Sequence, residues 1–297
     1  MGKVNTVTNL KVSVVMSVYA EPKKWIAEAI NSILNQTYRS YEFIIVNDNP
    51  ARSENDALLE YYKNKDPRII LLRNDINIGL TKSLNKALRI TKGKYIARMD
   101  ADDIANKSRL QLQVDFLENN KDYVLCGGGV KCIGNIRVNE KLYRYPQNND
   151  SIKIELLFKN VMVHPTLMYR NEILKRYNVQ YRVDKQYAQD YWFITELSKY
   201  GKFFNFKFPL IKYRISDRQI SHAKQEAQNE SALEARKMYS KFFNNVVFES
   251  KFRPWLHCIF GNYLFKEKFK WYEWFVIPVV AILVPKVLYY RFFKDKR

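Results

Sequence analysis

The sequence predicts an α/β fold in which a mostly parallel, Rossmann-like sheet carries helices on both faces. Two observations support this prediction. Apolar, β-rich segments alternate with segments of helical spacing through the first 130 residues. The chain has 297 residues, 47% of them hydrophobic and 27% charged, which suffices for a full core, and its nine glycines and nine prolines form no flexible linker.

The elements are expected in a regular order. The first strand, KVSVVMSVY, is apolar throughout and therefore predicted to be buried. Pro22 then starts a helix whose apolar residues, from Trp25 to Leu34, recur on one face. Ser53 is expected to cap a second helix with an acidic first turn. Strands are predicted at 11–19, 41–49, 68–74, 94–100 and 123–128, and helices at 22–34, 53–65, 79–91 and 106–120.

Polar residues follow the predicted strands at their carboxyl ends. Parallel sheets bind ligands at this edge, so we expect these side chains to share one site. They are Tyr19 and Glu21 after the first strand, Asn47 and Asp48 after the second, residues 73–77 after the third, and residues 100–103 after the fourth.

Three carboxylates, Asp100, Asp102 and Asp103, stand within four positions and would repel one another without a cation. No glycine-rich phosphate loop follows the first strand, and Gly127–Gly129 lacks the ending of a P-loop, so we predict a turn there. A Mg²⁺ or Mn²⁺ ion that carries a diphosphate fits the carboxylates. The alternative is that Asp102 and Asp103 cap the next helix, which leaves Asp100 unexplained.

Two long segments, VSVVMSVYAEPKKWIAEAINSILNQTYRSYEFIIVND and NDINIGLTKSLNKALRITKGKYIARMDADD, resemble the family 2 inverting glycosyltransferases. The resemblance spans roughly residues 12–221. It implies a GT-A fold and the transfer of a hexose-type sugar from a nucleotide-diphosphate sugar, with UDP favoured, by a Mn²⁺- or Mg²⁺-dependent enzyme. The implied acceptor is a hydroxyl of a glycan or lipid-linked saccharide in bacterial surface polysaccharide or lipopolysaccharide synthesis.

The resemblance also implies a role for individual residues. It leaves open a turn-forming role for Asp48, a core position for His164 and a helix-capping role for Asp190. On the donor side it implies nucleobase and ribose contacts for Tyr19 and Glu21, nucleobase binding for Asp48, and a nucleotide pocket lined by Asn77 and Gly79. Asp100 would bind the ribose or the sugar, and Asp102 the metal. On the acceptor side it implies general base catalysis for Asp190 and an acceptor cleft at His164.

The chain departs from the family pattern at two positions. Leu84 stands where many members have arginine, so Arg98 or Lys82 is expected to supply the missing contact to the sugar or phosphate. Ser216 stands where many members have a metal-binding histidine, so His222 is the candidate second metal ligand.

We expect a catalytic domain at 1–220, with a nucleotide-sugar half (1–130) and an acceptor half (131–220), and a helical extension at 221–297. The net charge is +20, and residues 201–297 carry 19 basic against 8 acidic side chains, a difference of 11. With the aromatic-flanked apolar stretch at 271–293, this predicts docking on an anionic membrane surface, peripherally on the inner, cytoplasmic face. A buried core helix and a true span are the alternatives.

The three cysteines, Cys126, Cys132 and Cys258, form no C-x-x-C pair, which fits a reducing compartment. Two other classes of function fit the sequence less well. A metal-dependent nucleotidyltransferase would show a glycine-rich loop after the first strand, which is missing. A basic nucleic-acid-binding protein would show a recognisable motif, which we do not find, so no nucleic-acid partner is predicted.

Overall fold

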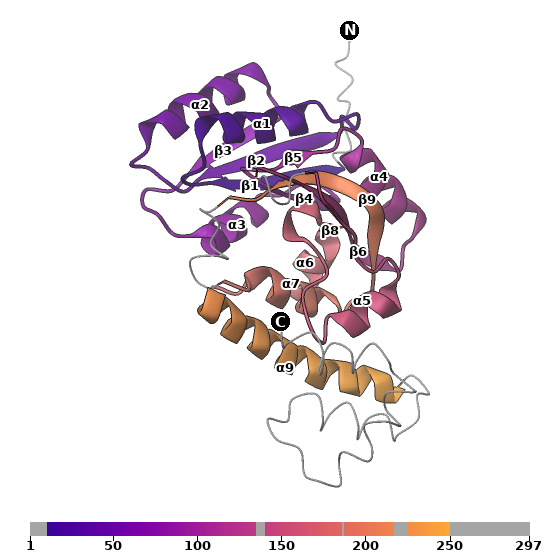
Figure 1. Cartoon of the computed structure of the whole chain (residues 1–297). Helices are drawn as coiled ribbons and strands as arrows, with labels where there is room; N and C mark the ends of the chain where they lie inside the picture. The colour runs from indigo at the N-terminus through magenta and orange to yellow at the C-terminus, as the bar shows by residue number, and fades with distance from the viewer. Residues whose placement is uncertain (1–10, 135–139, 186, 217–224, 250–297) are drawn as a thin grey trace.

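A single curled sheet with helices on both faces organises the protein (Figure 1). The structure is a computed structural model and describes residues 11–134, 140–185, 187–216 and 225–249. The strands are β1 (Val12–Val18), β2 (Tyr41–Asn47), β3 (Ile69–Arg73), β4 (Tyr95–Asp100), β5 (Ile104–Ala105), β6 (Tyr123–Ile133), β7 (Leu142–Tyr143), β8 (Met168–Arg170) and β9 (Lys202–Arg214). The helices are α1 (Lys23–Leu34), α2 (Ser53–Lys65), α3 (Leu80–Leu88), α4 (Arg109–Asn119), α5 (Asn149–Glu155), η1 (His164–Thr166), α6 (Asn171–Tyr177), α7 (Gln189–Leu197) and α9 (Gln225–Glu249).

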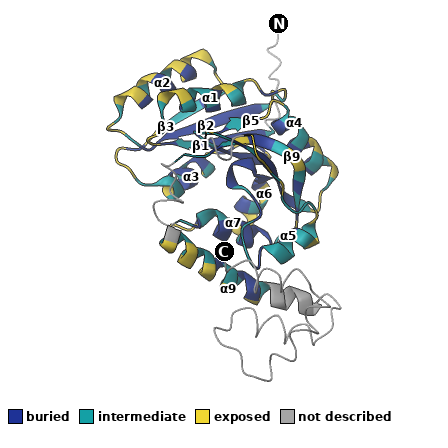
Figure 2. Ribbon diagram, viewed as in Figure 1, coloured by how far each residue is buried: buried dark blue, intermediate teal, exposed yellow. Residues whose placement is uncertain are grey.

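The strand order is β3-β2-β1-β4-β8-β6-β9-β5, and β7 pairs with β6. The first four strands are parallel, which confirms the predicted α/β fold. β8 runs antiparallel between β4 and β6, whereas the long β6–β9 pair is again parallel. Helices α1, α2 and α4 contribute to the core on one face of the sheet, and α3, α5, α6 and α7 to the core on the other. Burial is concentrated on the sheet and the inward helix faces (Figure 2).

The first helices match their predicted ranges, but their ends differ in detail. Helix α2 spans the predicted 53–65, yet Arg52 rather than Ser53 occupies its N-cap position, and no side chain caps it. Helix α4 begins at Arg109, three residues later than predicted. Residues 106–108 instead form the turn that leads into this helix, with Asn106 Oδ1 accepting from the backbone N–H of Ser108 (3.1 Å).

The predicted turn at Gly127–Gly129 is wrong, because all three glycines lie inside strand β6. Residues without a side chain are needed here because β9 and η1 pack closely against β6. A Cβ atom on Gly127 would lie 2.9 Å from Asn205 Oδ1, and one on Gly128 would lie 2.7 Å from Leu210 Cγ. The three glycines therefore serve close packing between strands rather than a chain reversal.

Helix α9, in the expected extension, packs against α7 (Figure 1). Its Ala235 and Tyr239 are buried in the core, and Tyr239 Oη donates to the carbonyl of Lys153 (3.1 Å). No helix among the described residues is both long and apolar enough to cross a membrane. The expected membrane-associating segment at 271–293 and the candidate ligand His222 lie outside the described residues.

Candidate active site

The carboxyl ends of the central strands are in register and bring the predicted polar groups to one edge. Val18 of β1 pairs with Asn47 of β2, and Ser17 pairs with Asp100 at the end of β4. Beyond Asp100 the chain turns, and one carboxylate oxygen from each of Asp100, Asp102 and Asp103 lies within 4.8 Å of the others. The sheet register therefore confirms the predicted convergence of these three carboxylates.

A buried arginine supplies positive charge beside the three carboxylates. Arg98 lies on β4, its side chain is 3% exposed, and its guanidinium forms an ion pair with Asp100. Its charge also acts on the carboxylates of Asp103 and Asp190, favouring their ionised forms. Arg98 Nε has no hydrogen-bond partner among the described residues.

Arg214, at the end of β9, holds the acidic turn from the other side. Its backbone N–H donates to Asp103 Oδ1 (2.8 Å), and its Nε donates to the carbonyl of Asp102 (2.8 Å). Its Nη2 pairs with Glu28 Oε2 of α1 (2.6 Å), and the guanidinium lies over the ring of Trp25. Arg214 therefore ties the carboxylate-bearing turn to α1 and to the second half of the chain.

This arrangement overturns the helix-capping alternative for the acidic turn. The N-cap residue of α4 is Ser108, and β5 intervenes between it and the carboxylates. Asp103 is fully buried against β9, whereas Asp100 and Asp102 remain partly accessible. Asp103 is thus a structural carboxylate, and Asp102 is the one oriented by Arg214 yet left open to a ligand.

The electrostatics of the turn fit a divalent cation. Burial first, and then the carboxylates of Asp100 and Glu21, raise the pKa of Asp102 to about 7. Burial followed by Asp102 and Asp100 also raises the pKa of Asp103. Excess negative charge in a desolvated site is relieved by a cation, and hard carboxylate oxygens suit Mg²⁺ or Mn²⁺. Asp102, assisted by Asp100, could hold such an ion.

Asp48 organises the loop that follows β3. Its Oδ1 accepts from Asn74 Nδ2 (2.8 Å) and from the backbone N–H of Ile78 (2.9 Å), so it bridges two loops and forms no local turn of its own. Oδ2 of this 2% exposed side chain has no partner in the described part of the chain. Asn77 Oδ1 accepts from the Gly79 N–H (2.9 Å), and Gly79 adopts a φ of 83° that favours glycine.

Tyr19 and Glu21 lie in the segment after β1, beside the same edge. Tyr19 is 47% exposed, and its carbonyl accepts from Asn55 Nδ2 (2.9 Å). Glu21 Oε2 accepts from the Tyr19 N–H (2.8 Å), and burial raises the pKa of Glu21. Because the Glu21 charge acts on Asp102, this segment and the acidic turn belong to one site.

The charge of Arg98 also acts on Asp190 and His164. Asp190 is in the first turn of α7, and its Oδ2 accepts from Asn160 Nδ2 (2.8 Å). Burial raises the pKa of Asp190, while the charge of Arg98 opposes that rise. His164 Nε2 and Tyr181 Oη are 2.8 Å apart, and burial lowers the pKa of His164. A buried, hydrogen-bonded histidine matches the core alternative for His164.

The structure describes the positions of Leu84 and Ser216, where the chain departs from the family pattern, and of the two candidate replacements for the missing arginine. Leu84 is 1% exposed in the core. Arg98 lies at the acidic turn, as expected of a replacement cation, whereas Lys82 is exposed on α3 and lines a pocket that the three carboxylates do not line. Ser216 is half-buried just beyond β9.

Sequence reasoning missed three supporting residues: Arg214, Glu28 and Asn160. Their partners lie 30 to 186 positions away along the chain. Only Arg214 carried a signal, because it belongs to the YR pair that precedes Ser216 in the family pattern.

The comparisons with known sequences agree with this geometry. The family model "Glycosyl transferase family 2" matches residues 13–178. An uncharacterized glycosyltransferase of Methanocaldococcus jannaschii is 37% identical over 244 residues, covering 80% of this chain and 83% of that protein. The Escherichia coli UDP-Glc:alpha-D-GlcNAc-diphosphoundecaprenol beta-1,3-glucosyltransferase WfgD is 28% identical, covering 72% and 80%. The chain therefore belongs to glycosyltransferase family 2.

Two solved structures show the same fold at low identity. Staphylococcus aureus TarS, in complex with UDP-GlcNAc, superposes with a TM-score of 0.64 at 17% identity, covering 84% of this chain and 70% of that one. The mannosyltransferase PcManGT from Pyrobaculum calidifontis, in complex with GDP-Man and Mn²⁺, gives 0.53 at 15% identity, covering 93% and 88%. The fold is GT-A, as the resemblance implied.

The buried position of Arg98 predicts a large loss of stability when it is replaced. Arg98→Met should lower the free energy of unfolding by about 3–5 kcal/mol, because Asp100 would lose its partner in a desolvated site. The control Arg73→Met, which breaks exposed pairs, should cost about 0–1 kcal/mol. Urea unfolding of both variants measures the difference. Equal midpoints would contradict a buried, charge-balancing role for Arg98.

Proposed function

We propose that this protein is an inverting glycosyltransferase that moves a hexose-type sugar from a nucleotide-diphosphate sugar to a hydroxyl of a glycan or lipid-linked saccharide. UDP is the favoured nucleotide. One observation supports this most directly: two carboxylate groups of different character, the acidic turn and Asp190, lie within the electrostatic reach of one buried arginine. Inverting transfer needs one site for the leaving diphosphate and a separate base for the acceptor.

On the donor side, Asp48 Oδ2 and the Asn77–Gly79 loop would contact the base, while Tyr19 and Glu21 would border the ribose. Asp102, positioned by Arg214 and assisted by Asp100, would hold Mg²⁺ or Mn²⁺. The bound ion would neutralise the charge that develops on the departing diphosphate. The ion pair with Arg98 holds the Asp100 carboxylate in place at the end of β4.

On the acceptor side, Asp190 would take the proton of the attacking hydroxyl. Asn160 orients the carboxylate by donating to Oδ2, which leaves Oδ1 for the acceptor. Arg98 and the first turn of α7 favour the anion in spite of its burial. Burial makes this carboxylate a stronger base than an ordinary exposed aspartate.

The names of related proteins support the choice of substrates. WfgD is named for a UDP-glucose donor and a diphosphoundecaprenol-linked acceptor. The TarS complex contains UDP-GlcNAc, and the PcManGT complex contains a nucleotide sugar together with Mn²⁺. These likenesses favour a nucleotide-sugar donor and a role in bacterial surface polysaccharide synthesis.

We propose further that the enzyme works peripherally on the cytoplasmic face of a membrane. The proposal rests on the sequence alone: the basic final third and the short, proline-interrupted apolar stretch near 271–293. A lipid-linked acceptor would present its sugar at that surface.

Replacing the proposed metal ligand should abolish metal-dependent turnover. Asp102→Asn should weaken Mn²⁺ binding, read from the electron paramagnetic resonance signal of the free ion, by about tenfold or more. In the wild type, Mn²⁺ affinity should fall as the pH drops below about 7, because protons compete for Asp102. The exposed control Asp115→Asn should match the wild type. Full UDP release from UDP-sugars by Asp102→Asn, or in excess EDTA, would refute the assignment.

Replacing the proposed base should affect turnover and spare donor binding. Asp190→Asn should lower turnover about 100-fold or more, with donor affinity nearly unchanged. Asp190 must be deprotonated to act as a base, and burial raises its pKa. Wild-type turnover should therefore fall as the pH is lowered, and the fall should begin at a higher pH than the ordinary aspartate range. Glu196→Gln, on the outer face of α7, is the matched control. Collapse of donor binding in Asp190→Asn would make Asp190 a binding residue instead.

Removing residues 272–297 should separate membrane docking from catalysis. We expect the shortened protein to stay folded and to hydrolyse donor slowly, but to stop floating with liposomes that contain anionic lipid. If the full chain ignores such liposomes and the shortened chain unfolds, the membrane proposal is wrong.

A further inference from the structure

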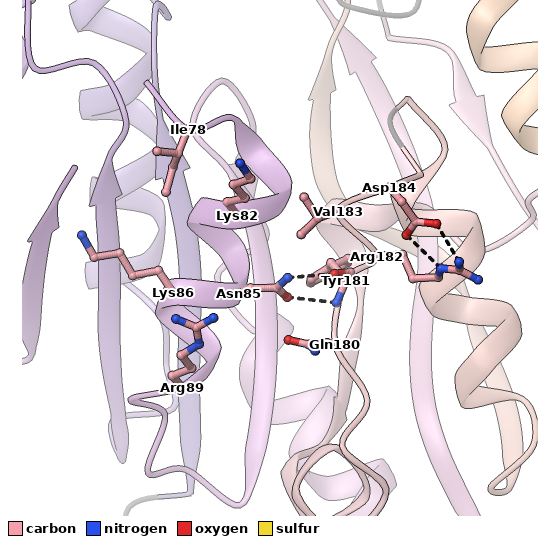
Figure 3. A pocket seen from close by; sticks show the side chains of 10 residues that line it. All are labelled: Ile78, Lys82, Asn85, Lys86, Arg89, Gln180, Tyr181, Arg182, Val183 and Asp184. Atoms are coloured by element: carbon pink, nitrogen blue, oxygen red, sulfur yellow. Dashed lines mark hydrogen bonds and ion pairs between the residues drawn. The ribbon is translucent and has the colours of Figure 1, made fainter. Parts of the chain in front are cut away.

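A pocket outside the acidic turn carries an excess of positive charge. It lies between α3 and the segment 180–184, and it has a volume of about 620 Å³ (Figure 3). Four cationic side chains line it, those of Lys82, Lys86, Arg89 and Arg182, against one carboxylate, that of Asp184. The size lies within the range of small-molecule sites.

The four cations are not equally available. Lys86 Nζ donates to the carbonyl of Arg73 (2.6 Å) and to Asn74 Oδ1 (2.8 Å), so it points out of the pocket toward β3. Arg182 pairs with Asp184 (2.6 Å) and lies over the ring of Trp192. The side chains of Lys82 and Arg89 have no hydrogen bond or ion pair with any described residue. Two unpaired cations on one wall are therefore free to meet an anion.

The two walls are fastened to each other at a buried contact. Asn85 Nδ2 donates to the carbonyl of Tyr181 (2.7 Å), and the Tyr181 N–H donates to Asn85 Oδ1 (2.9 Å). Asn85 is 6% exposed and Tyr181 is 1% exposed. This reciprocal pair holds α3 and the opposite segment at a set separation, so the pocket exists before any ligand binds.

Each wall also leads to one side of the proposed active site. The backbone N–H of Ile78, at one end of the pocket, donates to Asp48. On the other wall, the hydroxyl of Tyr181 contacts His164, and residues 180–184 lie shortly before the helix that carries Asp190. The pocket is thus connected to both proposed substrate sites: the α3 wall leads to the donor side and the 180–184 wall leads to the acceptor side.

We propose that Lys82 and Arg89 bind a phosphate or diphosphate group of the acceptor in this pocket. The inference rests on the proposed function and adds that the acceptor is anionic. In the proposed function, the diphosphate of the donor binds at the acidic turn by way of a metal cation. The only carboxylate in this pocket is already paired, so an anion here is bound by side chains directly and needs no metal.

Inorganic pyrophosphate in EDTA, at about 0.15 M salt, tests the pocket apart from any metal-dependent site. The variant is Lys82→Gln with Arg89→Gln in the full chain, and binding is followed by calorimetry. The control is Lys63→Gln with Lys65→Gln, which removes the same charge from exposed positions on α2. Binding of UDP with Mn²⁺ is measured on the same samples.

We expect wild type and control to bind pyrophosphate alike, and the Lys82/Arg89 variant to bind it about tenfold more weakly or worse, with UDP binding within twofold of wild type. No binding by wild type, or equal binding by all three proteins, would overturn the proposal. Joint loss of pyrophosphate and UDP binding would assign the pocket to the donor and also overturn it. Failure of every protein to bind UDP would instead refute the proposed function, while the pyrophosphate comparison would still decide the pocket.

Discussion

The ion pair between Arg98 and Asp100 is the interaction on which the rest of the site depends. Three carboxylates with oxygen atoms within 4.8 Å of one another repel each other in a largely buried turn, so the turn needs positive charge nearby. Arg98 is buried, and an arginine keeps its charge when buried, so one positive charge stays beside the three carboxylates when no ligand is bound, and an excess of negative charge remains. The same guanidinium favours the anion of Asp190, which links the donor and acceptor halves electrostatically.

Arg98 balances the charge, and Arg214 fixes the geometry. Asp103 Oδ1 accepts the backbone N–H of Arg214, which anchors the turn to β9, while Asp102 stays partly accessible. The Arg214 side chain also bonds to the Asp102 carbonyl and to Glu28 on α1, so it connects the end of β9, the acidic turn and the first helix. The curled sheet makes such a site possible, because β9 pairs with β5 just beyond the acidic turn and so brings Arg214 to the edge where β4 ends.

The alternation of strands and helices could be predicted from the sequence because periodicity is local. The polar strand ends could be predicted as well, since the carboxyl ends of neighbouring parallel strands share an edge. Gly127–Gly129 was misread because the reason for these glycines is the approach of Asn205 and Leu210, which local patterns cannot reveal. The sequence also suggested a metal as the cation among the aspartates, whereas the folded chain supplies Arg98 beside them and leaves Asp102 with a raised pKa.

The central claim is that Arg98 balances Asp100 while Asp102 remains the ligand for a cation that carries the donor. A crystal grown with Mn²⁺ and UDP, with anomalous scattering recorded at the manganese edge, tests it most directly. The account predicts one anomalous peak at about 2.0–2.3 Å from an Asp102 carboxylate oxygen, with UDP phosphate oxygens on the same ion and Arg98 still paired with Asp100. UDP bound at this edge with the manganese elsewhere, or with Arg98 detached from Asp100 and bonded to the diphosphate in place of a metal, would contradict it.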